Sequence, residues 1–82
     1  MVGKNQRKLE VLQFVKVETE TTANQVAREL EIEISNSKKL LARYWQMNLL
    51  RRRLVNKKTR ERAYSITQKG LDRIEWLNKN RK

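Results

Sequence analysis

The stretch that decides the fold runs from Thr22 to Met47 and reads TANQVARELEIEISNSKKLLARYWQM. Thr22 precedes Gln25 by three residues, which is the spacing of a capping box, where two side chains satisfy free amides at the start of a helix. At 100° per residue one narrow apolar stripe then follows, made of Val26, Ala27 and Leu30. The pattern predicts a helix over residues 22–31.

A second helix is expected after only a few residues, over 34–47. One of its sides carries Ser37, Leu40, Leu41, Tyr44 and Met47, and the other carries Ser35, Asn36, Lys38, Lys39, Ala42, Arg43 and Gln46. The second side is hydrophilic apart from one alanine and holds no acid. Asn48 follows, and asparagine tolerates the left-handed conformation that ends a helix. Two helices this close in sequence predict a helix-turn-helix.

Three further elements are expected around this pair. Residues 6–16 form a first helix, because Leu9, Val11, Leu12 and Val15 share a broad apolar face. Two β-prone runs joined by a polar, basic loop predict a hairpin over about 49–66. Thr67 caps a last helix over 68–79, whose stripe is Leu71, Ile74 and Leu77.

The expected fold class is therefore mainly α with a small β-hairpin. A three-helix core carries the hairpin as a wing and ends in a C-terminal helix, which is the winged helix-turn-helix arrangement. The 82 residues contain no proline, no repeat and no low-complexity tract. A single domain over 1–82 is the simplest organisation.

Charge is distributed unevenly along the chain. The net charge is +11, yet residues 1–37 hold five Lys/Arg and six Asp/Glu, while residues 38–82 hold fifteen Lys/Arg and three Asp/Glu. Such a split concentrates positive potential on one part of the molecule, as expected for a surface that neutralises the phosphates of a polyanion. Charge that serves only solubility is the plainer alternative.

Composition excludes most catalytic chemistry. The chain has neither cysteine nor histidine, so we expect no thiolate or imidazole metal site, no cofactor and no nucleophile activated by histidine. Asp72 and Glu75 share one exposed helix turn without a partner acid, so we expect no enzyme. There is no apolar run long enough for a membrane span and no signal-peptide pattern in residues 1–6, which predicts a soluble, cytoplasmic protein.

The candidate DNA-binding residues lie on the helix expected over 34–47, which is the third helix in chain order, and on the hairpin. The second helix of such a pair enters the major groove, which assigns Ser35, Asn36, Lys38, Lys39 and Arg43 to the DNA side. Asn36 and Lys39 are the stronger base readers, because asparagine can pair with adenine and lysine with guanine. The wing adds Arg51, Arg52, Arg53, Lys57, Lys58, Arg60 and Arg62, against the single Glu61, for the backbone or an adjacent minor groove.

Three segments also resemble a known family. They are ANQVAREL (residues 23–30), NLLRRR (48–53) and RAYSITQKG (62–70), and together they resemble winged-helix transcriptional regulators of bacteria and archaea of the MarR and PadR kind. The resemblance implies a three-helix core, a wing and control of transcription. Two departures are Asn48, in place of the usual glycine, and the lack of the extra helices with which those regulators dimerise.

Dimerisation and the kind of partner are left open by the residues. Phe14 and Trp76 lie off their apolar stripes, so each is a candidate contact of a homodimer, or else packs under a loop or chain end. Double-stranded DNA is the expected partner. RNA, or an acidic protein within a larger nucleic-acid complex, is the alternative, although the polar face of the third helix favours duplex DNA.

Overall fold

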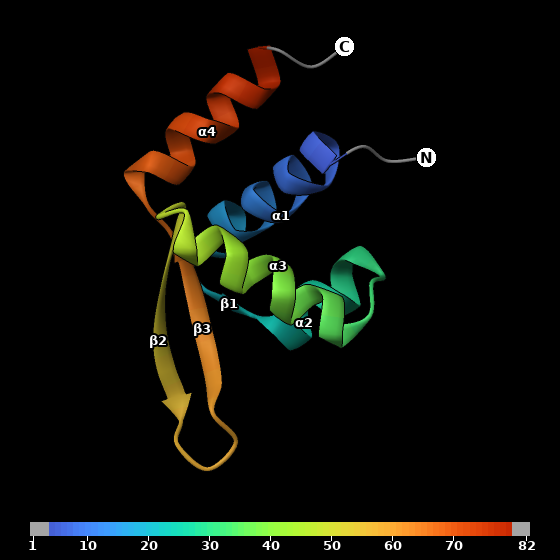
Figure 1. The fold of residues 1–82 in the computed structure, drawn as a ribbon, viewed down its shortest axis with the longest axis vertical. Helices are drawn as coiled ribbons and strands as arrows, with labels where there is room; N and C mark the ends of the chain where they lie inside the picture. Colours follow the sequence, from blue (N-terminus) through green and yellow to red (C-terminus); the bar gives the residue numbers. More distant parts are fainter. Residues whose placement is uncertain (1–3, 80–82) are drawn as a thin grey trace.

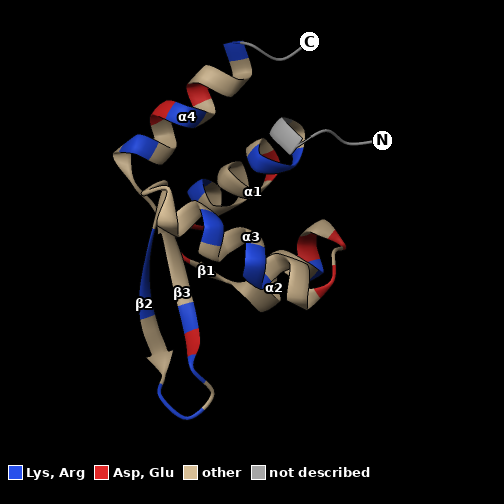
Figure 2. Ribbon diagram, viewed as in Figure 1, with Lys and Arg blue, Asp and Glu red and all other residues tan. Residues whose placement is uncertain are grey.

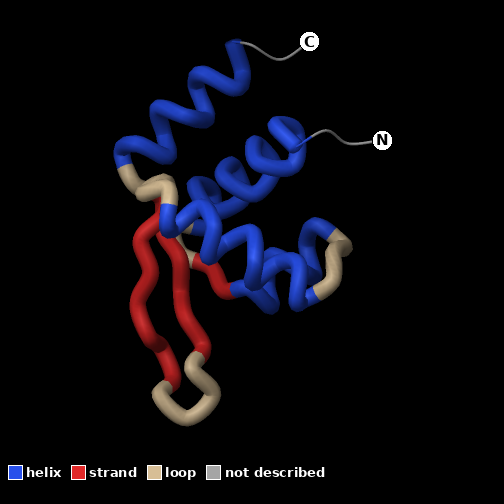
Figure 3. The backbone as a smooth tube through the Cα atoms, in the orientation of Figure 1, coloured by secondary structure: helices blue, strands red, loops and turns tan. Residues whose placement is uncertain are grey.

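The computed structural model describes residues 4–79, which form four helices and a three-stranded antiparallel sheet (Figure 1). The elements follow the chain in the order α1 (Lys4–Glu18), β1 (Thr21–Thr22), α2 (Ala23–Leu30), α3 (Ile34–Gln46), β2 (Leu50–Asn56), β3 (Glu61–Ile66) and α4 (Gln68–Lys79). The hairpin of β2 and β3 projects from the helices at one end of the molecule, and α4 lies toward the other end (Figures 1 and 3). The predicted fold class is confirmed.

Local signals place the helix-turn-helix. The Thr22 hydroxyl accepts a hydrogen bond from the Gln25 amide at 3.4 Å, and the Gln25 side chain accepts one from the Thr22 amide at 3.1 Å, so the capping box is complete. Glu31 ends α2 in the left-handed conformation with φ of 55°. Where α3 meets the start of α2, the buried Ser37 hydroxyl donates to the Ala23 carbonyl at 2.7 Å. A small side chain at this position lets the two helices approach closely.

The sheet contains a strand that the sequence analysis does not predict. β1 is only two residues long and pairs with β3, with Thr21 opposite Tyr64 and Thr22 opposite Ala63. The strand order is β1-β3-β2, so β3 is central and ties the hairpin to the helices. Two threonines carry no periodicity, and their strand character comes from pairing with a segment some forty residues away.

The core lies between the helices and the base of the sheet. It includes the fully buried residues Val11, Leu12, Val15, Val26, Leu41 and Leu49. Phe14 is half-buried and packs against this core, so the expectation that its ring lies off the packed face is wrong. The reason is that α1 contacts α2, α4 and β3, which bury a wider arc of the helix than one stripe. Trp76 is 51% exposed.

The base of the wing is fixed by a tight junction. Asn48 adopts the predicted left-handed conformation with φ of 64°. The Thr67 hydroxyl donates to the Asn48 carbonyl at 2.7 Å and accepts from the Gly70 amide at 3.0 Å, which caps α4 as predicted. Gly70 leaves room for the Leu49 carbonyl, because a Cβ here would lie 2.6 Å from Ile66 Cδ1 and closer still to that oxygen. The junction therefore sets the direction in which the wing leaves the helices.

The helices also bear on the question of a membrane span. Within residues 4–79 no helix combines the length and the apolar composition that crossing a bilayer requires.

Candidate nucleic-acid interface

The exposed side of α3 carries the predicted recognition residues. The residues Ser35, Asn36, Lys38, Lys39 and Arg43 are all exposed, while Ser37, Leu41 and Tyr44 are buried on the opposite side. The side chains that anchor the helix and those that face solvent therefore separate as the 3.6-residue period requires. The exposed side contains no carboxylate, so nothing on it opposes the approach of phosphates.

A groove of about 630 Å³ separates this helix from the wing. Its cations come from both walls: Lys38 from α3 and Arg52, Arg60 and Arg62 from the hairpin. The only carboxylate in its lining is that of Glu61. Figure 2 shows basic residues along β2, around the hairpin loop and on α3. The fold thus places one predicted cation of α3 and three of the hairpin on the two sides of one groove, whereas Lys39, Arg43, Arg51, Arg53, Lys57 and Lys58 lie outside its lining.

The tip of the wing is an ordered turn. The side-chain oxygen of Asn56 accepts hydrogen bonds from the amides of Lys58 at 2.9 Å and Thr59 at 3.4 Å. Arg60 adopts the left-handed conformation with φ of 57° as the chain reverses. The side chains of Lys57, Lys58 and Arg60 are exposed. The turn therefore presents cations at the end of the molecule farthest from α4.

The arginine triplet does not act as one group. Arg51 is exposed. The Arg52 guanidinium lies 3.4 Å from the centroid of the Trp45 ring, which packs it against α3. Arg53 donates from Nε and Nη2 to the two carboxylate oxygens of Glu20, at 2.8 Å and 2.7 Å. Alternate residues of a strand face opposite sides, so neighbouring arginines meet different partners.

Asn24 and Glu20 each bind a side chain of the wing, and neither contact is predicted from the sequence. The Asn24 side chain, in the first turn of α2, donates to the Glu61 carboxylate at 3.3 Å. Glu20 holds Arg53 from the turn before β1. The period-two pattern of β2 could have separated Arg52 from Arg53. No local signal indicates which acid or aromatic ring each would meet, since both contacts depend on the tertiary fold.

Positive charge continues from α3 towards α1 and α4. Partial burial lowers the pKa of Lys8 on α1, and the nearby charges of Arg73 and Arg43 lower it further. Burial raises the pKa of the Tyr44 phenol on the inner side of α3. Lys8, Arg43 and Arg73 are therefore close enough to influence one another, so cations of α1, α3 and α4 lie near each other outside the groove.

Together, a helix-turn-helix, an acid-free side of its second helix and a basic hairpin beside that helix define a winged helix. No protein-family model matches the sequence, and no curated protein matches it in sequence. Solved structures do match. The YusO protein from Bacillus subtilis is 25% identical, with a TM-score of 0.79, and the match covers 95% of this chain and 54% of that one.

Two structures of MarR from E. coli match in the same way. The apo form is 15% identical with a TM-score of 0.79, and the match covers 90% of this chain and 54% of that one. A mutant MarR complexed with operator DNA is 18% identical with a TM-score of 0.75, covering 89% of this chain and 52% of that one. This chain spans about half the length of these proteins.

The resemblance inferred from the sequence is confirmed by these matches. The matched structures are MarR-family winged-helix regulators, which are not enzymes. These matches show that the chain has the winged-helix fold.

Proposed function

We propose that this chain binds double-stranded DNA sequence-specifically as a homodimer and thereby regulates transcription in the prokaryotic cytoplasm. The observation that carries the proposal is the groove between α3 and the wing, where cations from both walls face a space that contains one carboxylate. A groove of this charge attracts phosphates, and release of their counterions provides most of the affinity. The operator complex of the matched MarR mutant supports the same partner.

The exposed side of α3 is assigned to the major groove. Asn36 and Lys39 read base edges, because an amide can pair with adenine and an ammonium group with the acceptors of guanine. Ser35, Lys38 and Arg43 flank them on the same exposed side. We assign these three residues to phosphate contacts, which fix the register of the helix on the duplex without reading sequence.

Charge reversal on α3 tests this assignment. We expect Lys39→Glu with Arg43→Glu to abolish binding to a duplex that the wild-type protein selects from a random pool. The matched control is Lys16→Glu with Arg28→Glu, which makes the same change of charge at exposed positions of α1 and α2. Circular dichroism checks that both variants fold. Equal losses in the two variants would mean that net charge alone drives binding, and an unaffected α3 variant would refute the assignment.

The wing is assigned to the phosphate backbone or an adjacent minor groove. Replacing Lys57, Lys58 and Arg60 by alanine should weaken binding to all duplexes alike. The slope of log affinity against log salt should become shallower by about one unit for each phosphate that the wing no longer neutralises. A loss of affinity confined to the selected sequence would show instead that the loop reads bases. If the affinity of the wild-type protein for duplex DNA does not fall as the salt concentration rises, the result would favour an acidic protein as the partner.

The proposed homodimer places contacts on α4, where Trp76 is the exposed aromatic candidate. The Arg73 guanidinium lies 5.7 Å from the centroid of its ring, and the two residues line a shallow groove with Lys69 and Asp72. A large aromatic at a partly exposed site is typical of subunit contacts. Sedimentation equilibrium of the wild type and of Trp76→Ala tests the proposal, which fails if the wild type is monomeric both alone and on DNA.

A further inference from the structure

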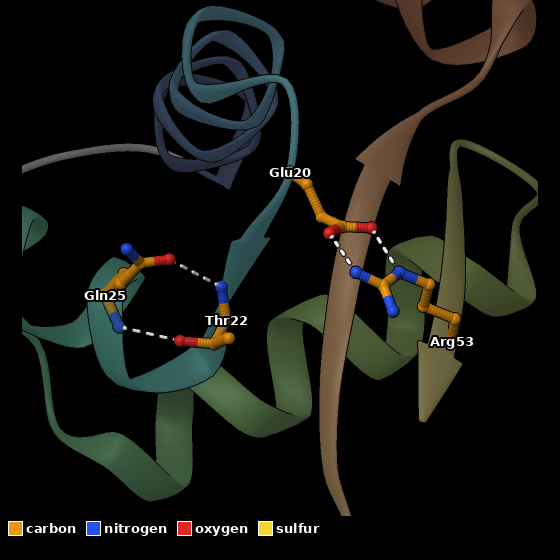
Figure 4. A network of polar contacts seen from close by, with 4 residues as sticks. All are labelled: Glu20, Thr22, Gln25 and Arg53. Atoms are coloured by element: carbon orange, nitrogen blue, oxygen red, sulfur yellow. Dashed lines mark hydrogen bonds and ion pairs between the residues drawn. The ribbon is translucent and has the colours of Figure 1, made fainter. Parts of the chain in front are cut away.

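Glu20 is an acidic residue attached to the basic wing. It lies in the turn between α1 and β1, and its carboxylate receives two hydrogen bonds from the Arg53 guanidinium in β2 (Figure 4). The two groups belong to opposite edges of the sheet, because β3 lies between β1 and β2. The ion pair therefore passes across the central strand and joins the free edge of the wing to the helical body.

The backbone around Glu20 is fixed on both sides. Thr19 adopts the left-handed conformation with φ of 66°, and the Glu20 amide donates to the Glu18 carbonyl at 2.6 Å. Thr21, the next residue, is buried and pairs with Tyr64 of β3. The position of the carboxylate is thus set by the fold before it meets the guanidinium. The hydrogen bonds between the two side chains lower the pKa of Glu20 and raise the pKa of Arg53.

This ion pair differs from the others in residues 4–79. Arg7 with Glu10 and Lys79 with Glu75 each lie within one helix, whereas Glu20 and Arg53 are thirty-three residues apart. A planar guanidinium bonded to both oxygens of a carboxylate fixes orientation as well as distance. Arg53 also does not line the groove that faces α3, although its neighbour Arg52 does.

We propose that Glu20 is a positioning residue for DNA binding: through Arg53 it holds the wing at its angle to α3 and removes Arg53 from the phosphate contacts. The inference rests on the proposed DNA binding and adds to it. It divides the cations of the wing into those that meet DNA and one that orients the others. It also gives an acid a supporting role in a surface built to attract a polyanion.

The proposal is tested by the direction in which one substitution changes the affinity for DNA. Glu20→Gln removes a negative charge, and electrostatics alone would then tighten binding to DNA. A positioning role requires the opposite, a loss of affinity of roughly two- to fivefold, which is the range expected for an exposed pair of this kind. The matched control is Glu18→Gln, which removes the same charge at an exposed position that forms no ion pair within residues 4–79. Binding to a random-sequence duplex is measured for both by fluorescence anisotropy over a range of salt concentrations.

A charge swap separates the pair from the individual charges. Glu20→Arg combined with Arg53→Glu keeps the net charge and the pair but places an acid on the wing, while Arg53→Glu alone breaks the pair. We expect the double variant to recover most of the affinity that the single variant loses. If Arg53 contacts phosphate, the double variant stays as weak as the single one. Arg53→Lys adds an independent check: it should weaken binding if the bidentate geometry matters and leave it unchanged if only charge does.

Hydrogen exchange without DNA keeps the two proposals distinguishable. Amides of β2 and β3 should exchange faster in Glu20→Gln than in Glu18→Gln or the wild type, because the wing is less firmly held. Faster exchange with no DNA binding by the wild type would refute the proposed function and leave the ion pair as a structural fastening. Unchanged exchange, or tighter DNA binding by Glu20→Gln, would overturn the positioning role of Glu20.

Discussion

Replacing Gly70 by alanine should destabilise the protein, although the position is helical. Gly70 is buried in the first turn of α4, where an added Cβ would lie 2.6 Å from Ile66 Cδ1 and 2.9 Å from Ile66 Cγ1, and closer still to the Leu49 carbonyl oxygen. That oxygen also accepts a hydrogen bond from the Thr67 amide at 3.1 Å. It cannot retreat without weakening the bond that closes the base of the wing.

The expected size of the effect follows from two opposing contributions. Alanine stabilises a helix interior relative to glycine by about 1 kcal/mol. Overpacking a buried site costs about 1–3 kcal/mol, and the upper half applies here because one obstacle is a backbone atom. The net loss of stability is roughly 1–2 kcal/mol, which for a domain of this size lowers the melting temperature by about 4–15 °C.

Thermal unfolding followed by circular dichroism measures this loss. Asn78→Ala, at an exposed position of α4, is the control, since it keeps the gain in helix propensity without the steric conflict. Combining Gly70→Ala with Ile66→Val should recover only part of the stability, because valine removes the conflict with Cδ1 and leaves those with Cγ1 and with the Leu49 carbonyl. A Gly70→Ala protein that melts at or above the wild-type temperature would refute the argument from close approach.

Three further predictions concern the ends and contacts of single elements. Thr22→Ala should cost about 1 kcal/mol in chemical denaturation, because it removes the hydroxyl half of the capping box of α2. Ser37→Ala should cost about 1–2 kcal/mol in the same assay, because it leaves the Ala23 carbonyl without the hydroxyl that donates to it at 2.7 Å. The Glu20 carboxyl should titrate by NMR below the ordinary glutamate pKa, because Arg53 stabilises its charged form, and should return towards that value in Arg53→Gln. The folded-state pKa is the lower one, so the pair's contribution to stability is complete above the ordinary glutamate pKa and is lost as the pH falls through the lowered value.

Much of the fold follows from local patterns. The helices and the hairpin begin and end within two residues of their predicted positions, because caps such as Thr22 and Thr67 and the left-handed Asn48 are determined by nearby residues. β1 could not be predicted in the same way, since Thr21 and Thr22 become a strand only by pairing with β3.

Helical periodicity succeeds for α3 and fails for part of α1. One side of α3 faces the protein and the other faces solvent, so its period separates Tyr44 from Lys39 correctly. α1 is covered by three neighbouring elements, and the arc that they bury reaches Phe14. A stripe derived from one period assumes a single packed face, and it therefore misplaces residues on a helix that is surrounded. The breadth of burial is a property of the assembled fold.

The same distinction applies to charge in the candidate site. Arg51, Arg52 and Arg53 are identical in type and adjacent in sequence, and each is an equally good phosphate ligand by composition. The fold leaves Arg51 exposed, stacks Arg52 on Trp45 and pairs Arg53 with Glu20. A guanidinium already bonded to both oxygens of a carboxylate must lose those bonds before it can bind a phosphate in the same way, whereas an exposed one has no such cost. Charge density therefore locates the face that we propose binds DNA, and tertiary pairing decides which cations on the wing are available for that role.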